Sequence, residues 1–154
     1  MNTNNALSVA SSKSTRVSLA GIRIGRFDLS ERRISLLKRV PNPGEYFKFE
    51  LDSIEMIDLA YLTAKTGDEF ALLRSKSCDV LFHGYRTDCT FYGELKDGLK
   101  SHEYVLVGHS HPGEDEPIPS SEDRAFLRET GQKTSKVISA RTGRVSDYTQ
   151  DIIG

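Results

Sequence analysis

Two histidines and one aspartate lie within fifteen residues of one another in the second half of the chain. His109 and His111 follow residues 104–107, whose aromatic and β-branched side chains predict a buried strand. Because residues two apart in a strand point to the same face, the two imidazoles are expected to project side by side. Pro112 then ends the strand. Asp123 falls in the first turn of a predicted helix, and two imidazoles with one carboxylate are a common ligand set for a catalytic zinc ion.

Each half of this pattern also has an ordinary structural explanation. A His-x-His pair at the end of a strand is often a pair of surface imidazoles. Ser120-x-x-Asp123 fits the capping box of a helix that binds no metal. Taken separately, each half favours the ordinary explanation. Their occurrence together favours a metal site formed by His109, His111 and Asp123.

The two motifs together resemble the zinc signature of the JAMM/MPN+ metalloproteases, the JAB domain. The family pattern is an upstream glutamate, then His-Ser/Thr-His-Pro, then Ser-x-x-Asp. Here His109-Ser110-His111-Pro112 and Ser120-x-x-Asp123 match it. Eight residues, 112–119, separate the two motifs, one more than the family usually has. An insertion of one residue in a loop costs little free energy, so the ligand assignment stands and the shape of this loop is left open.

A zinc hydrolase of this kind needs a general base that takes a proton from the metal-bound water. The resemblance implies a glutamate at the start of a strand, and Glu69, followed by small and apolar residues, best fits that context. In an extended strand Glu103 would point to the same face as the histidines, but it would lie about 20 Å from His109. Glu94 lies in a connector, and the loop after the histidines would hold its own glutamates, Glu114 and Glu116, less rigidly.

Ser120 has two compatible roles. As a helix cap it would satisfy backbone donors, and by resemblance to the family it would donate a hydrogen bond to the oxyanion of a tetrahedral intermediate. His83 and His102 have no partner at ligand spacing and are expected to be ordinary surface or strand histidines. Cys78 and Cys89 fit neither a zinc knuckle nor a disulfide framework, so two reduced cysteines are predicted.

The overall composition carries no sign of a nucleic-acid or membrane partner. A length of 154 residues predicts one domain, or one domain with an irregular leader. A formal net charge of −1 gives no electrostatic reason to expect nucleic acid or an anionic membrane. No apolar run approaches the roughly 20 residues of a membrane span, and no signal peptide is recognisable. A cytoplasmic location is therefore expected.

The predicted elements indicate an α+β domain that follows a leader. Residues 1–45 are expected to be a partly disordered leader, with one or two short strands suggested over 17–27 and turn residues at 41–44. Residues 46–154 are expected to form a mixed β-sheet flanked by helices, an α/β/α-like arrangement. The predicted elements are helices over 52–65 and 121–130, strands over 69–73, 80–84, 89–92 and 104–107, a connector over 95–100, and a hairpin of 136–140 with 144–148.

The resemblance covers residues 50–150 and implies a zinc-dependent metallopeptidase that hydrolyses a peptide or isopeptide bond. Its substrate would be a protein or peptide, with a ubiquitin-like modifier as one candidate. The implied fold is JAB/MPN-like, similar to the cytidine-deaminase-like architecture. Gly108 and Asp123-Arg124 favour the bacterial JAB domains, some of which are carried by toxin or phage-related proteins, so delivery by a toxin system is left open. Two alternatives remain: a non-catalytic MPN-like interaction module, and a zinc amidohydrolase acting on another amide.

Overall fold

The computed structural model describes residues 7–11, 31–113 and 115–151. This part of the chain contains eight strands and four helices, which confirms the predicted mixed α+β class. The strands suggested over residues 17–27 lie outside the described residues. The elements, in chain order, are β1 (Leu7–Ala10), α1 (Glu31–Lys38), β2 (Tyr46–Glu50), α2 (Met56–Thr66), β3 (Phe70–Arg74), β4 (Cys78–His83), β5 (Asp88–Phe91), α3 (Gly93–Lys100), β6 (Val105–His111), α4 (Ser121–Thr130), β7 (Thr134–Ser139) and β8 (Val145–Thr149).

Six of the described strands form one mixed sheet in the order β2-β4-β3-β6-β7-β8. Within that sheet β6 and β7 run parallel, whereas the other neighbouring pairs are antiparallel. A parallel pair needs a crossover connection, usually a helix. Here the crossover contains α4, and it brings the start of α4 close to the carboxyl end of β6. β1 and β5 form a separate antiparallel pair.

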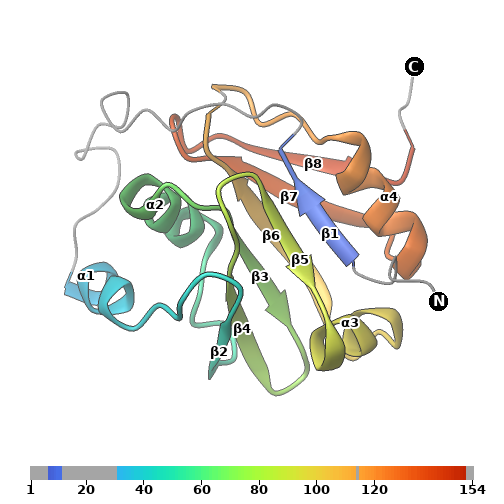
Figure 1. The fold of residues 1–154 in the computed structure, drawn as a ribbon, viewed down its shortest axis with the longest axis horizontal. Helices are drawn as coiled ribbons and strands as arrows, with labels where there is room; N and C mark the ends of the chain where they lie inside the picture. Colours follow the sequence, from blue (N-terminus) through green and yellow to red (C-terminus); the bar gives the residue numbers. More distant parts are fainter. Residues whose placement is uncertain (1–6, 12–30, 114, 152–154) are drawn as a thin grey trace.

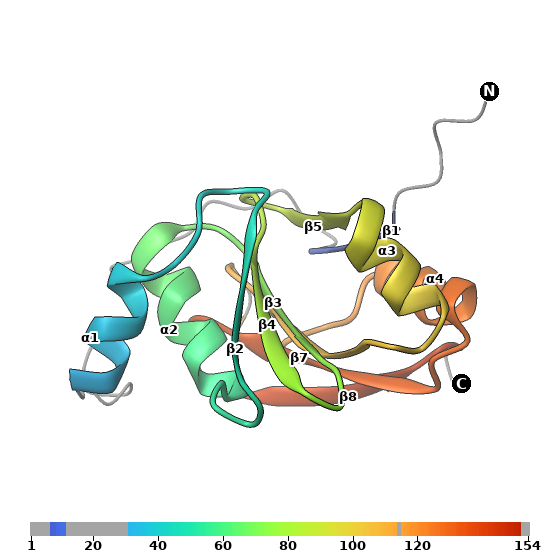
Figure 2. The same ribbon diagram turned by 90° about the horizontal axis from the view of Figure 1, so that it is seen from below.

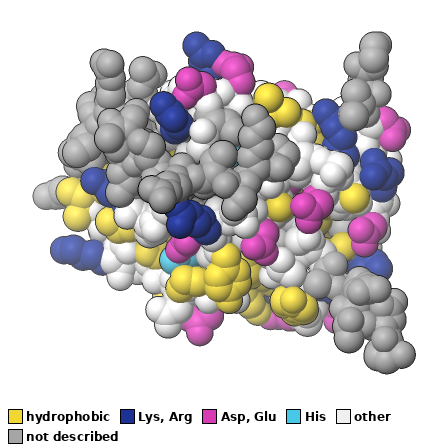
Figure 3. Space-filling view, turned by 45° about the horizontal axis from the view of Figure 1, so that its top comes forward, with side chains coloured by type: hydrophobic (Ala, Val, Ile, Leu, Met, Phe, Trp, Pro, Cys, Tyr) yellow, Lys and Arg dark blue, Asp and Glu magenta, His cyan; other side chains and the backbone are white. Residues whose placement is uncertain are grey.

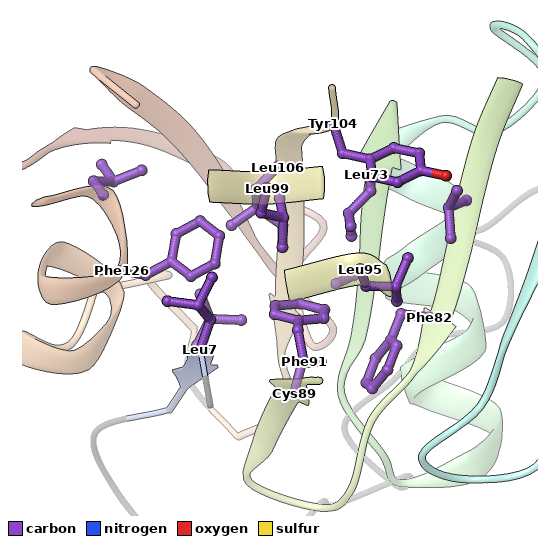
Figure 4. Packing of buried hydrophobic residues seen from close by; sticks show 14 of the residues in the cluster. Leu7, Leu73, Phe82, Cys89, Phe91, Leu95, Leu99, Tyr104, Leu106 and Phe126 are labelled. Carbon is purple, nitrogen blue, oxygen red and sulfur yellow. The ribbon is translucent and has the colours of Figure 1, made fainter. Parts of the chain in front are cut away.

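The six-stranded sheet lies between two apolar cores, each covered by different elements (Figures 1 and 2). Successive residues of β3 alternate between the cores, since Phe70 and Leu72 point to one and Ala71 and Leu73 to the other. The smaller core lies under α2 and α1. The larger core is enclosed by β1, β5, α3 and α4. Figure 4 shows Leu7 of β1 in this larger core, beside aromatic rings from β5 and α4.

Two segments of the predicted leader contribute to these cores. β1 pairs with β5, and its Leu7 and Val9 side chains are buried. α1 packs on α2, where Leu36 is buried and the guanidinium of Arg33 lies 3.1 Å from the buried carboxylate of Asp58. Residues before the predicted boundary near residue 45 are therefore packed on the residues that follow it.

α2 begins later than the sequence indicated. The predicted start at residue 52 is wrong: Asp52-x-x-Glu55 has the residue types of a capping box, but Asp52 lies in a turn with φ 62°. Glu55 is the N-cap instead, and it forms a capping box with Asp58. The predicted end of the helix is confirmed, since Gly67 closes it in the left-handed conformation.

The predicted connector over residues 95–100 is also wrong, because Gly93–Lys100 form α3. Leu95 and Leu99 are one helical turn apart and both are buried in the larger core. Gly98 lies against the ring of Tyr104, so close that an added Cβ would meet a ring carbon at 2.3 Å. Burial of the two leucines and this close approach outweigh the low helix propensity of glycine.

The surface mixes charges of both signs. On the face shown in Figure 3, Lys and Arg side chains are interspersed with Asp and Glu. Lys136 pairs with Asp147, and Arg141 pairs with Asp115. Among the described helices, none combines the length and the apolar character that a membrane span requires.

Candidate metal centre

The carboxyl end of β6 places the two histidines. The register between β3 and β6 shifts once, which makes Val107 an extra residue in β6. Leu106 therefore packs in the larger core and Val107 in the smaller one. After this bulge, His109 pairs with Ala71 and points to the face of the larger core, as His111 does. The prediction that Glu103 points to the same face as the histidines is wrong. Glu103 precedes β6, and the bulge interrupts the alternation of side chains along that strand.

His109, His111 and Asp123 meet in one buried cluster, and each is 0% exposed. Nε2 of His109 lies 3.1 Å from Nε2 of His111, and Oδ2 of Asp123 lies 3.2 and 3.3 Å from these two nitrogens. Donor atoms held tetrahedrally at 2.0–2.1 Å from one ion would be roughly 3.3 Å apart. The three atoms have the spacing of a single coordination sphere, so this group could hold a metal ion.

The first turn of α4 fixes the aspartate. Ser120 is the N-cap, and its hydroxyl accepts a hydrogen bond from the Asp123 amide at 3.1 Å. The Ser120 amide donates in return to Oδ2 of Asp123 at 3.0 Å, which is the predicted capping box. Oδ1 of Asp123 accepts a hydrogen bond from the amide of Ala10 in β1 at 2.9 Å. The box that begins the helix thus also orients the carboxylate toward the histidines.

Burial and charge favour the protonation states that coordinate a metal. Burial lowers the pKa of His109, against the opposing effect of Asp123. Burial alone would raise the pKa of Asp123, but the charges and hydrogen bonds of His109 and His111 hold it well below its usual range. The positive end of the α4 dipole acts in the same direction on this carboxylate. Neutral imidazole and ionised carboxylate are the forms that bind metal ions.

Glu69 lies directly before β3 and is 0% exposed. Its Oε2 accepts a hydrogen bond from the Ser11 amide at 3.0 Å. Its Oε1 is buried and has no hydrogen-bond partner among the described residues. Burial raises the pKa of Glu69 well above its usual range; His111 and Ser11 oppose the rise, and Asp123 adds to it. An unpaired buried carboxylate oxygen within electrostatic reach of candidate ligands is a suitable partner for a bound water molecule.

The hydroxyl of Ser120 donates a hydrogen bond to the carbonyl oxygen of Ala10 at 2.7 Å. Backbone groups of Ala10, the last residue of β1, and of Ser11, which follows it, therefore contact three of the five predicted site residues. Sequence reasoning missed this contribution, although the alternation of Leu7, Ser8 and Val9 is typical of a strand.

Sequence reasoning also missed Tyr148 of β8, whose ring contacts that of His109 edge to face. The structure brings together the predicted side chains Glu69, His109, His111, Ser120 and Asp123.

Ser110, between the two histidines, points to the opposite side of β6. Its Oγ accepts a hydrogen bond from the Phe70 amide at 2.9 Å and lies 2.5 Å from Oγ1 of Thr63 in α2. Gly108 also faces α2, where an added Cβ would come within 2.4 Å of Sδ of Met56. These close contacts with β3 and α2 hold the histidine strand in place from behind.

The competing carboxylates lie elsewhere. Glu94 is exposed and accepts a hydrogen bond from the Tyr46 hydroxyl. Glu103 is exposed at the turn before β6, and Glu116 pairs at the surface with Arg144. Glu114 lies outside the described residues. Within the part of the chain that the structure describes, Glu69 is therefore the glutamate next to the cluster.

The remaining histidines and cysteines have structural surroundings. Nδ1 of His83 lies 2.7 Å from the Pro41 carbonyl oxygen, and its Nε2 lies 2.8 Å from the Asp68 carboxylate. Nε2 of His102 lies 2.7 Å from the Thr130 carbonyl oxygen. Neither histidine belongs to the cluster. The two cysteines are free, as predicted.

Comparison with known proteins gave no match: no family model fits the chain, and no curated protein or solved structure is significantly similar to it. The functional argument therefore depends on the geometry of the site and on the motifs that form it.

Proposed function

We propose that this protein is a zinc-dependent metallopeptidase of the JAMM/MPN+ type, with a JAB/MPN-like fold. The observation that carries the proposal is the buried cluster of His109, His111 and Asp123 with an unpaired carboxylate oxygen of Glu69 next to it. Two imidazoles disfavour magnesium and calcium, which prefer oxygen ligands. The same donor set is used by non-haem iron, but an adjacent general base and a hydroxyl donor favour hydrolysis.

Two residues of the chain, Glu69 and Ser120, would take part directly in the reaction. A bound zinc ion would polarise the scissile carbonyl and lower the pKa of the attacking water. Glu69 would take a proton from that water and pass it to the leaving amine. Ser120, whose hydroxyl already donates to a carbonyl oxygen, would stabilise the developing oxyanion. Burial of Glu69 and of the ligands excludes bulk water, which strengthens each of these interactions.

The proposed substrate is a protein or peptide, and an isopeptide bond to a ubiquitin-like modifier remains one candidate. A cytoplasmic location and delivery by a toxin system are both compatible with this function. The alternatives are a non-catalytic MPN-like interaction module and a hydrolase for another amide. The first of these would not need a buried glutamate with one unpaired carboxylate oxygen beside a complete ligand set.

Zinc binding is the direct test. We expect the metal-free protein to take up about one zinc ion per chain, because three ligands and an open position form one site. His109→Ala should lose most of this binding in a calorimetric titration. The matched control is His102→Asn, which retains a residue that tolerates the positive φ of 71° at that position. Wild-type protein that binds no zinc would exclude the metallopeptidase and favour the interaction module.

A further inference from the structure

β1 covers the candidate metal centre. It pairs with β5 and packs against α4, so that it lies between these two elements (Figure 1). Leu7 and Val9 are buried in the larger core, and their burial fixes the strand along its length. Ala10 and Ser11 follow at the carboxyl end of β1, where the strand reaches Asp123, Ser120 and Glu69.

The hydrogen bonds at this end converge on one peptide bond. The carbonyl oxygen of Ala10 accepts from the Ser120 hydroxyl at 2.7 Å. The amide of Ser11, on the other side of the same bond, donates both to Oε2 of Glu69 and to the carbonyl oxygen of Thr87, each at 3.0 Å. The Ala10 amide is held by Oδ1 of Asp123 at 2.9 Å. The bond between Ala10 and Ser11 is thus bound through both of its polar atoms.

These contacts match the two roles that peptide hydrolysis assigns to the site. The oxyanion donor must contact the carbonyl oxygen of the bond that is cut, and the proton carrier must reach its nitrogen. Ser120 and Glu69 make these contacts to a single bond. The remaining oxygen of Glu69 is unpaired, which leaves it available to a water molecule.

We infer that the protein hydrolyses its own chain between Ala10 and Ser11; this inference rests on the proposed function. In this reaction water adds its oxygen to the carbonyl carbon of Ala10, and the bond from that carbon to the nitrogen of Ser11 breaks. The nitrogen keeps the electron pair and receives a proton that Glu69 has taken from the water. The products are a carboxylate on Ala10 and a new amino terminus on Ser11.

The test uses the full chain, purified without metal and then mixed with one equivalent of zinc. Intact mass should change with time from the full chain to two products, residues 1–10 and residues 11–154. Terminal sequencing should read Ser11 first. Because β1 already lies in the site, the half-time should not change over a tenfold range of protein concentration. A half-time that falls in proportion to concentration would show cutting between molecules and would overturn the inference.

Two variants separate this reaction from a contaminating protease. Glu69→Gln should bind zinc and be cut about 10²–10⁴-fold more slowly, because glutamine cannot carry the proton. Glu94→Gln, an exposed glutamate away from the site, should be cut at the wild-type rate. Equal cutting of the wild type and Glu69→Gln would overturn the inference.

A second readout does not depend on zinc or on turnover. In the metal-free protein, the amides of Ala10 and Ser11 should exchange with deuterium as slowly as those of β5, because the first is bonded to the buried Asp123 carboxylate and the second to Glu69 and to the Thr87 carbonyl oxygen. Rapid exchange at these two amides would show that β1 does not occupy the site. A zinc-loaded wild type that stays intact would overturn self-cleavage but leave the proposed function standing. Failure to bind zinc would instead remove the proposed function itself.

Discussion

Ser110 shows how a motif residue can serve the centre without facing it. The histidines on either side contribute candidate ligand atoms, whereas Ser110 bonds to Phe70 of β3 and contacts Thr63 of α2. The three residues are buried. The hydroxyl therefore fixes the distance between β6 and the two elements behind it, and the orientation of the imidazoles depends on that distance.

Ser110→Ala should weaken both stability and zinc binding. The substitution leaves the Phe70 amide and the Thr63 hydroxyl without this partner in a dry environment, at a cost of about 1–3 kcal/mol in the free energy of unfolding. Loss of a supporting contact behind ligands should also lower zinc affinity by roughly 10–100-fold. Urea denaturation and calorimetric titration measure the two effects. Ser121→Ala, at an exposed position of α4, is the control, and a Ser110 variant that matched it would show that Ser110 does not support the site.

The five site side chains could be predicted because their signal lies in residue types at short spacings. His109 and His111 needed only the alternation of a strand, and Ser120 with Asp123 needed only the geometry of a helix cap. Glu69 was chosen because the family resemblance implies a glutamate at the start of a strand, and its context fits. The partners of these residues at the end of β1 could not be found in this way, because they are backbone groups of Ala10 and Ser11, which every residue type offers.

At the scale of elements, a buried aspartate joins β4 to β3 and to the segment before α2. Asp79 is 0% exposed and accepts hydrogen bonds from Nε of Arg74 at 2.7 Å and from the Ile54 amide at 3.0 Å. Burial alone would raise the pKa of Asp79, but the bonds from Arg74 and from backbone amides more than offset it and lower the pKa. The folded protein therefore favours the ionised carboxylate.

This lowered pKa makes part of the stability dependent on pH. A depressed pKa contributes stability above the unfolded value, about 4 for aspartate, and the contribution is lost as the pH falls through the folded value. Asp79→Asn should therefore cost about 2–3 kcal/mol at pH 7, and the difference from wild type should shrink below pH 4. Urea midpoints between pH 7 and pH 2 test this. Asp147→Asn, an exposed partner of Lys136, should change stability little at any pH; a pH-independent loss in Asp79→Asn would contradict the assignment.

The elements around the site were also the easiest to predict. α4 runs over the predicted residues because Ser120 begins it and Gly131 ends it. The hairpin of β7 and β8 also formed as expected, with small shifts at its ends. α3 was missed because two glycines mask its helical pattern, and its burial depends on Tyr104, whose ring position the sequence does not specify. The start of α2 was misplaced because two overlapping acidic pairs could each form a capping box.

At the scale of the whole molecule, the candidate metal centre joins parts of the chain that are otherwise distant. Its residues come from β6, from the first turn of α4 and from the residue before β3, and β1 is bonded to it. A metal that binds only to this assembled arrangement stabilises the folded state in proportion to the logarithm of its concentration.

Zinc should therefore raise the melting temperature. At a free concentration about 1,000 times the dissociation constant, the gain is roughly 4 kcal/mol, and for a chain of this size each kcal/mol corresponds to about 2–4 °C. Differential scanning calorimetry, with and without a chelator, measures the shift. Magnesium at the same concentration should have little effect, because two of the ligands are imidazoles. An equal shift in Asp123→Asn would place the bound zinc somewhere else.

The position of β1 in the sequence also determines when, during synthesis and folding, its contacts with the site can form. Ala10 and its partner Asp123 are 113 residues apart, so during synthesis β1 is made long before the element that receives it. Contacts of such long range cost more chain entropy to close than local ones, so we expect them to form after the local elements. If the bond after Ala10 is cut only when it rests on Glu69 and Ser120, the cut cannot happen on a partly made or misfolded chain. Each new amino terminus at Ser11 would then record that one molecule had completed its folding.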